Sequence, residues 1–508
     1  MKLKIKTLTP IHIGTGKELT PLEFFNNYRI NYNKLFDLIA EEKKDEFFNW
    51  IDQIQNATIS ITNIQKKFNI KTNDIISKCG LYRFNQSFQD KVREGIKDSS
   101  NKLFIPGSSI KGAIRTALMY KVLKTAYYNS TINNSIESLI SKAKNLRGQT
   151  RKIKSLLRSA DDELQNKVFN CGVLKEKDGK QEIKYDDQKY DLLKLVRISD
   201  SESVATDTNG EICELQVYAL KKEKAYEPFK VYTESIAEHT ELEFDISIDV
   251  DFLKQAKIEL NEPNADFGKK YFIGIEQKLK NLFDINIKNY TELDENKIIN
   301  TILQALKDFG AAISNLESKW VQTINNSSKI SSLKKLYSND NKFKVGFGTG
   351  FSGMTILPLL LDHPKLKQKV YEFYKAVGIG YHNSTKKSLV IDEFPFTRKY
   401  FNQQTVLGGF GWVTILNGNQ IKTENAISQI SEVINTHTKP INSVLAEITN
   451  DKSKPPRVKI LEGEHNGKET ILTQVNIVNL GIKIGSKVYV ELVLQGKVLQ
   501  GARFQKKA

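Results

Sequence analysis

The sequence of 508 residues predicts an α+β fold built from ferredoxin-like, or RRM-like, units. Segments with the two-residue alternation of strands are mixed with segments of helical spacing, without the strict alternation of a doubly wound sheet. Hydrophobic residues make up 39% of the chain, which is enough apolar material for a sizeable core. At about 150 residues per domain, roughly three domains are expected.

The N-terminal segment begins with a predicted half-buried strand at 2–8, where Leu3 and Ile5 alternate with lysines. The motif P-I-H-I-G-T-G at 10–16 then turns the chain with two glycines. Residues 34–98 carry apolar side chains near helical spacing, so this stretch is expected to be mostly helical.

A second motif, I-P-G-S-S-I-K-G-A-I-R-T-A-L at 105–118, predicts a helix whose start binds phosphate. Ser108 or Ser109 is a candidate N-cap, and Lys111 and Arg115 lie one helical turn apart. Unpaired N–H groups at a helix start, together with hydroxyls and bases, suit a phosphate group. The alternative is an ordinary capped helix with solvated bases.

Further strands and helices follow, and the last strands form a domain of their own. The segment at 452–456 is rich in Lys and Pro, as linkers are, and the alternation after it predicts a small basic β barrel of OB or similar type. The other predicted strands lie at 194–199, 212–220, 229–234, 242–250 and 407–416, and the other predicted helices at 267–325, 365–376 and 422–436.

A glycine-rich loop, G-F-G-T-G-F-S-G, occupies 346–353. It matches the dinucleotide pattern only formally, because Pro358 interrupts the helix that such a site needs. The interleaved Phe347 and Phe351 favour a flexible backbone clamp that offers stacking surfaces to RNA. The alternative is a bulged turn with its aromatic side chains in the core. The glycines of this candidate site are Gly346, Gly348, Gly350 and Gly353.

Two further positions are candidates for functional contacts. Arg398 lies in T-R-K-Y-F at 397–401, where bases stand next to aromatics and suit RNA backbone contact and stacking. A strand rim with packed aromatics is an equal alternative. His12 has the chemistry of a general acid or base, but a lone histidine beside a strand end is more often structural. The histidines lack metal-ligand spacing, so no metal and no cofactor is expected.

The charge of the chain is +17, from 76 Lys and Arg against 59 Asp and Glu. This excess suggests a polyanionic partner such as RNA, whereas lysines scattered by an AT-rich genome explain the composition equally well. The basic run at 141–158 is interpreted either as a solvated insertion or as an RNA or partner contact. Three distant cysteines, the lack of a signal peptide and the lack of a long apolar run predict a cytoplasmic protein without membrane contact.

The two N-terminal motifs and the late glycine loop resemble those of the RAMP proteins of CRISPR effector complexes. Together with V-R-I-S-D at 196–200 and T-R-K-Y ahead of L-G-G-F-G-W-V, they are most similar to the fifth subunit of the type III-A (Csm) complex. The resemblance covers roughly residues 1–420.

This resemblance implies a non-catalytic subunit that binds CRISPR RNA and caps the backbone filament near the 3′ end of the guide. The implied partners are CRISPR RNA, the neighbouring backbone RAMP subunit, the small subunit and, indirectly, target RNA. One alternative is a metal-independent RAMP endoribonuclease that processes precursor CRISPR RNA with His12 and a second group, either Tyr28 or a lysine near the scissile phosphate. Another is a nucleotide-binding protein that uses the glycine loop. Carried over to this sequence, the RNA-binding residues are His12, Gly14, Gly16, Ser108, Ser109, Lys111, Arg115, Gly346, Gly348, Gly350, Gly353 and Arg398.

Three regions are expected from the motifs and the resemblance. Residues 1–255 would form an N-terminal RAMP module with helical insertions near 34–98 and 120–190. Residues 256–451 would form a second RAMP-like region that holds the glycine loop, and residues 452–508 the small basic β domain.

Overall fold

The computed structural model mixes helices and sheets, as the sequence predicts, and its contacts divide the chain into two compact units. The first unit comprises Met1–Leu416 and the second Asn417–Ala508. The predicted helix at 422–436 and most of the predicted linker lie outside the described residues. The structure describes all residues except 54–58, 85–89, 126–127, 147, 222–223, 263–265, 289–293, 325, 339–340, 379–394, 396, 404–405, 417–443, 451–455, 474–482, 496–497 and 508.

A five-stranded antiparallel sheet has the first strand of the chain at its centre. β1 pairs with β12 on one side and β16 on the other, so Ile5 stands opposite both Leu242 and Ile415. Buried side chains alternate along β1, as expected for the predicted half-buried strand. In sheet order the strands are β13 (Phe343–Lys344), β16 (Trp412–Leu416), β1 (Lys2–Thr7), β12 (Glu241–Ile248) and β9 (Val196–Ile198).

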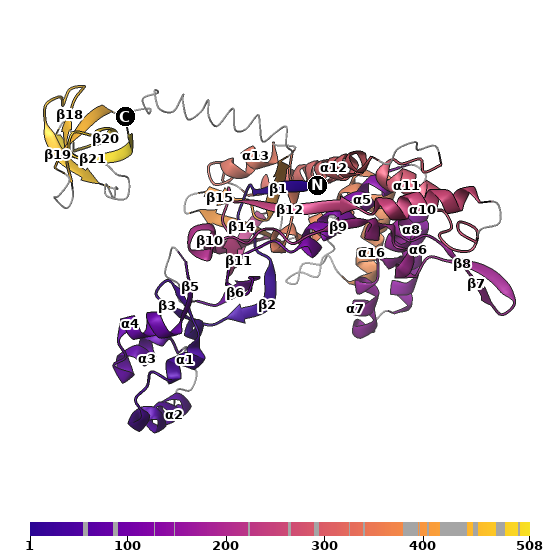
Figure 1. Ribbon diagram of the computed structural model, residues 1–508, viewed down its shortest axis with the longest axis horizontal. Helices are drawn as coiled ribbons and strands as arrows, with labels where there is room; N and C mark the ends of the chain where they lie inside the picture. The colour runs from indigo at the N-terminus through magenta and orange to yellow at the C-terminus, as the bar shows by residue number, and fades with distance from the viewer. Residues whose placement is uncertain are drawn as a thin grey trace. The chain divides into compact units, whose positions relative to one another are not determined.

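A six-stranded sheet has the long hairpin of β10 and β11 at its centre (Figure 1). β14 extends the hairpin on the β10 side in antiparallel pairing, and β6 pairs in parallel with β11. In sheet order the strands are β15 (Val406–Gly408), β14 (Thr397–Gln403), β10 (Gly210–Lys221), β11 (Lys224–Ile236), β6 (Val92–Gly95) and β2 (Gly14–Leu19).

Helices pack around one large apolar core in the first unit. α5 packs against α12 and α6 against α16, so Leu118 and Ile302 share this core from either side of position 255. The expected division at 255/256 therefore does not separate two compact units. No helix within the described ranges is long and apolar enough to cross a membrane. The main helices of this core are α5 (Gly107–Leu123), α6 (Asn129–Asn145), α7 (Thr150–Arg158), α8 (Asp162–Phe169), α10 (Val250–Asn261), α11 (Ile275–Phe283), α12 (Glu295–Val321), α13 (Ser331–Tyr337), α15 (Leu357–Asp362) and α16 (Pro364–Val377), with the short α9 (Thr206–Asn209) and α14 (Gly350–Met354).

The stretch at 34–98 is helical only in its first part, which corrects the expectation. α1 to α4 gather around a separate apolar cluster, beside a small sheet of β3, β4 and β5 (Figure 1). The chain then returns to the six-stranded sheet, because Val92 of β6 pairs with Tyr232. The insertion at 120–190 holds α6 to α8 and a hairpin of β7 and β8. The helices and strands of these two insertions that have no bounds above are α1 (Tyr32–Phe36), α2 (Lys44–Gln53), α3 (Ile61–Phe68), α4 (Thr72–Asp74), β3 (Phe24–Phe25), β4 (Tyr28–Ile30), β5 (Gly80–Arg83), β7 (Val173–Lys177) and β8 (Lys180–Lys184).

The second unit is a closed five-stranded barrel with its own apolar core. The order around the barrel is β17-β18-β19-β21-β20, and only β19 and β21 run parallel among these neighbours. β17 precedes the predicted linker at 452–456 but pairs with both β18 and β20, so the boundary predicted at 452 cuts through the barrel. The strands are β17 (Val444–Asn450), β18 (Arg457–Ile460), β19 (Glu469–Thr473), β20 (Lys487–Gln495) and β21 (Val498–Lys507).

Candidate nucleic-acid interface

Three loops that are far apart in the sequence meet through their backbones. The amide of Phe347 donates a hydrogen bond of 2.8 Å to the carbonyl of His12, which joins the glycine loop to the first motif. The amide of Gly411 donates to the carbonyl of Pro10 at 2.9 Å, and its own carbonyl accepts from Val345 at 2.8 Å. The structure therefore brings together the first motif, the glycine loop and L-G-G-F-G-W.

Two glycines make this close approach sterically feasible. Gly346 has a φ of 77°, and a Cβ there would lie 2.4 Å from the carbonyl oxygen of His12. At Gly348 a Cβ would lie 2.6 Å from the carbonyl oxygen of Phe410. Side chains at either position would push the loops apart. α14 begins at Gly350 and includes Gly353. Gly14 and Gly16 lie elsewhere, on the exposed strand β2.

Two positive charges lie close to the half-buried ring of Phe347 at this junction. The guanidinium of Arg93 on β6 lies 4.6 Å from the ring centroid, and the ammonium of Lys399 on β14 lies 4.9 Å from it. The ring also packs on an apolar patch of the six-stranded sheet that includes Cys213 and Leu215. The sequence points to Phe347 as part of this site but not to Arg93. The only sequence signal for Arg93 is its outward position in the short strand V-R-E-G.

Electrostatics at the junction favour an anion. Arg93 is exposed, and Lys399 is partly buried. Burial lowers the pKa of Lys399, and the nearby charges of Arg93 and Arg398 lower it further. A phosphate bound by both Arg93 and Lys399 would relieve this repulsion.

His12 lies under this junction and is only 2% exposed. Its Nδ1 is 2.7 Å from the carbonyl oxygen of Glu234, and because a carbonyl only accepts, Nδ1 is the donor. Burial lowers the pKa of His12 to about 4; the hydrogen bond opposes this effect, and the charges of Arg93 and Lys97 add to it. The imidazole is therefore neutral at pH 7, and it packs edge-on against Phe347.

The start of α5 differs from the prediction. The helix begins at Gly107, and neither Ser108 nor Ser109 acts as its N-cap. Instead the carboxylate of Asp200, in V-R-I-S-D, accepts a hydrogen bond of 2.8 Å from the amide of Gly107. An acid of the chain itself thus occupies the position where a phosphate was expected, while Ser108 remains exposed.

The two bases of α5 are also used within the fold. The ammonium of Lys111 donates to the carbonyl of Val196 at 2.7 Å, and burial lowers its pKa. Arg115 forms an ion pair with Asp191 and lies 4.4 Å over the ring of Phe169. Both side chains hold α5 against neighbouring segments, which corrects the prediction that they are the main exposed phosphate contacts.

Arg398 is a buried structural residue. Its side chain is 8% exposed, its Nε donates to Glu317 at 2.8 Å, and its guanidinium lies 5.1 Å from the ring centroid of Trp320. The prediction of an RNA contact at Arg398 is corrected for this reason. The T-R-K-Y segment presents Lys399 to the junction instead, because successive residues of a strand point to opposite faces.

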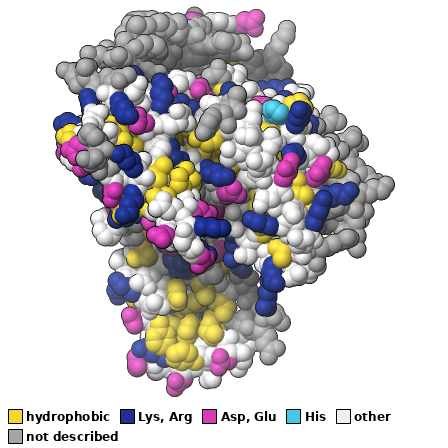
Figure 2. Space-filling model, turned by 90° about the vertical axis from the view of Figure 1, so that its right-hand side faces the viewer, with side chains coloured by type: hydrophobic (Ala, Val, Ile, Leu, Met, Phe, Trp, Pro, Cys, Tyr) yellow, Lys and Arg dark blue, Asp and Glu magenta, His cyan; other side chains and the backbone are white. Residues whose placement is uncertain are grey.

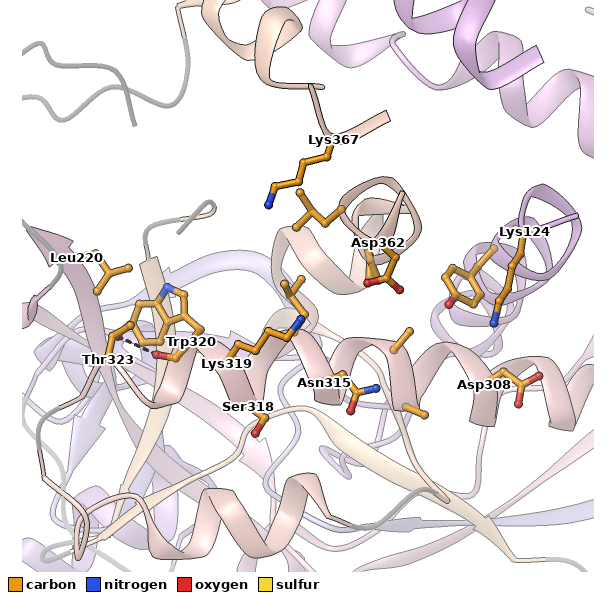
Figure 3. Close-up of a pocket in the computed structure, with 16 residues that line it drawn as sticks. Lys124, Leu220, Asp308, Asn315, Ser318, Lys319, Trp320, Thr323, Asp362 and Lys367 are labelled. Atoms are coloured by element: carbon orange, nitrogen blue, oxygen red, sulfur yellow. Dashed lines mark hydrogen bonds between the residues drawn. The ribbon is translucent and has the colours of Figure 1, made fainter. Parts of the chain in front are cut away.

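The rest of the surface carries charges of both signs. Figure 2 shows one face on which Lys and Arg are distributed among Asp and Glu rather than gathered in one patch. A cavity of about 1190 Å³ lies along α12 (Figure 3). Side chains of both charge signs line this cavity, so it lacks the uniform positive charge that favours a polyanion. The charged lining residues are Lys124, Asp308, Lys319, Asp362 and Lys367.

Comparison with known proteins identifies the family. A model of the RAMP superfamily matches residues 4–322. The chain belongs to the RAMP superfamily. Its curated relatives include a "CRISPR system Cms protein Csm5" of Methanocaldococcus jannaschii, 25% identical over 437 residues, which cover 81% of this chain and 88% of the relative. A protein of the same name from Streptococcus thermophilus is 29% identical over 290 residues, which cover 53% of this chain and 70% of the relative.

A solved structure shares the fold of this RAMP protein. It belongs to a "Csm-crRNA-target RNA ternary complex in type III-A CRISPR-Cas system" and has a TM-score of 0.52 with 22% identity. The match covers 82% of this chain and all of the other. The predicted resemblance to a Csm5-like RAMP protein is confirmed by the family match and by the relatives of that name, and the solved structure shares the fold.

Proposed function

We propose that the chain is a non-catalytic subunit that binds CRISPR RNA in a type III-A complex. In this proposal it caps the backbone filament near the 3′ end of the guide, where it contacts the neighbouring backbone RAMP subunit and the small subunit, and target RNA indirectly. The relatives named Csm5 support membership of such a complex. The observation that carries the RNA-binding role is that Arg93 and Lys399 both lie close to the ring of Phe347.

This arrangement fits single-stranded RNA. An aromatic surface binds a base of any sequence by stacking, and flanking cations bind the phosphates on either side of that base. The glycine loop lets the RNA backbone approach closely, since Gly350 has no other heavy atom within 4 Å of a Cβ position. The site therefore suits a guide whose sequence changes from one complex to the next.

The buried environment of His12 favours the non-catalytic role over the alternative of an endoribonuclease. A catalytic imidazole must reach the scissile phosphate, but His12 is only 2% exposed; its pKa, lowered to about 4 by burial, also leaves it without the proton that a general acid needs near pH 7. Its Nδ1 is also engaged with Glu234.

Three further features belong to the same proposal. The two sheets of the first unit act as RRM-like modules, and the barrel is an accessory RNA contact. A cytoplasmic location suits the three cysteines, which are buried and free.

Incubation of the purified chain with CRISPR repeat RNA in a chelator tests the proposal against its alternative. We expect saturable RNA binding without discrete cleavage products. Products cut at one position in the wild type and lost in His12→Asn would establish the endoribonuclease instead. Failure to bind either repeat or guide RNA would remove the RNA-binding role altogether.

A further inference from the structure

We propose that a groove next to the glycine loop docks an acidic amphipathic helix of a partner protein. The groove has a volume of about 250 Å³ and lies between α5, α6, α7 and α8 on one side and α14, α15 and α16 on the other. Its lining is mostly aliphatic and includes Met119, Leu139, Leu164, Ile356 and Leu360. This volume suits a few aliphatic side chains of a helix that lies across the groove.

The apolar lining continues onto exposed side chains at α14. Met354 is 69% exposed and Phe351 is 40% exposed, and both line the groove. Large apolar side chains that remain in water beside an apolar groove mark an interaction surface, because covering them is favourable. Methionine adapts its shape to different partners, which suits a docking position.

The charge beside the groove selects an acidic partner. α7 contributes Leu157 to the lining, and Ile153, Leu156 and Leu157 pack partly on the core. The bases of α7 are all exposed, and none forms an ion pair with another residue in the described ranges. The lining itself holds one base and one acid: Arg115 is paired with Asp191, and Asp161 accepts a hydrogen bond from Gln165. The exposed bases of α7 are Arg151, Lys152, Lys154 and Arg158.

A protein helix fits the groove better than RNA does. Bases stack on exposed aromatic faces, but of the three aromatic side chains in the lining only Phe351 is exposed, and Phe373 and Tyr374 are 9% and 8% exposed. Aliphatic walls instead match the Leu, Ile or Val anchors that an amphipathic helix presents at every third or fourth position. Neither Arg93 nor Lys399 lines the groove, so this inference goes beyond the proposed RNA site and does not depend on it.

Fluorescence anisotropy with the full-length chain tests the docking site. The probe is a labelled synthetic helix of about 18 residues, or five turns, with Leu at positions i, i+3, i+4 and i+7, four Glu on the opposite face and Ala or Gln elsewhere, so that like charges do not unfold it. We expect Met354→Asp and, separately, Lys152→Glu/Lys154→Glu to weaken its binding about tenfold. The control Lys177→Glu/Lys180→Glu makes the same charge change on the exposed hairpin of β7 and β8 and should change binding less than about twofold.

The same assay contains the results that would overturn the proposal. A scrambled Leu/Glu peptide that binds equally well would show general electrostatic attraction. Unchanged affinity in Met354→Asp would exclude the groove, since this exposed position tolerates Asp without unfolding, as a circular dichroism melt would verify. If a labelled U-rich oligonucleotide lost affinity in Met354→Asp while the peptide did not, the groove would be an RNA site and the helix partner would be rejected.

Discussion

Glu317 and Arg398 form an ion pair of 2.8 Å behind the glycine loop, with side chains that are 2% and 8% exposed. The second carboxylate oxygen of Glu317 accepts from the hydroxyl of Ser352 at 2.9 Å, and Lys344 donates to the carbonyl of Gly348 at 2.9 Å. Burial alone would raise the pKa of Glu317, but the charges of Arg398 and Lys344 outweigh it and keep the pKa below its ordinary value. The ion pair thus connects α12 and β14 to the loop that carries Phe347.

Glu317→Gln should destabilise the protein strongly. The substitution leaves the buried guanidinium of Arg398 without its counter-charge, which costs about 3–5 kcal/mol. Urea unfolding followed by circular dichroism measures this loss. The control Lys167→Ala removes an exposed ion pair with Glu163 and should change the free energy of unfolding by less than about 0.5 kcal/mol. Equal effects of the two substitutions would show that the buried pair does not support the loop.

His12 should make stability depend on pH. Its pKa in the folded protein is about 4, below the ordinary 6.5, so the unfolded chain binds the proton first as the pH falls. The neutral, buried imidazole contributes fully to the free energy of unfolding above pH 6.5. About 3 kcal/mol of this contribution is lost as the pH falls towards 4. His12→Asn keeps a donor for Glu234 but cannot titrate, so its free energy of unfolding should vary less across this window. Parallel curves for the two proteins would contradict the assignment.

Sequence reasoning located the loops of the candidate site but not the bases that serve it. The strand at 2–8 and the two loops were predictable because alternation and glycine spacing are local signals. Whether Lys111 or Arg398 faces solvent depends on Val196 and Glu317, which the fold brings from distant segments. No local pattern records such partners.

The same dependence on distant segments explains why the sequence predicts neither the role of Arg93 nor the boundary of the barrel. Arg93 stands in a four-residue strand whose role becomes visible only when Phe347 lies beside it. β17 looks like the end of the preceding region because the Lys/Pro segment follows it, yet its pairing partners β18 and β20 come later in the chain. Pairing between strands overrides the local linker signal.

Arg93→Ala/Lys399→Ala should weaken binding of single-stranded RNA. Each base neutralises one phosphate in the proposed site, so the slope of log affinity against log salt should become shallower by about 1.4. Filter binding at several salt concentrations measures this slope. Lys111→Ala serves as the control: its ammonium is held by Val196, so it should leave the slope unchanged. A slope that changes only in Lys111→Ala would return the phosphate site to α5.

Gly346→Ala should disrupt the junction more than Gly350→Ala does. Both glycines combine a positive φ with an extended ψ, at 77° and −156° for Gly346 and at 64° and −177° for Gly350, so either alanine costs about 1–3 kcal/mol of backbone strain. At Gly346 the new Cβ would also meet the carbonyl oxygen of His12 at 2.4 Å, whereas the position at Gly350 is open. The melting temperature should therefore fall further in Gly346→Ala than in Gly350→Ala. Equal melting temperatures would show that the two loops are not packed as described.

Truncation should distinguish the two compact units. A chain that ends at Asn450 keeps β17 without β18 and β20, so its backbone edges and the apolar side chains of Ala446 and Ile448 become exposed. Unpaired strand edges promote aggregation. A chain that ends at Leu416 removes the barrel as a whole and retains the core of the first unit, including the pairing of Leu416 with Lys4. Light scattering after gel filtration should show a monodisperse product ending at Leu416 and aggregates for the product ending at Asn450. The reverse result would mean that β17 belongs to the first unit rather than to the barrel.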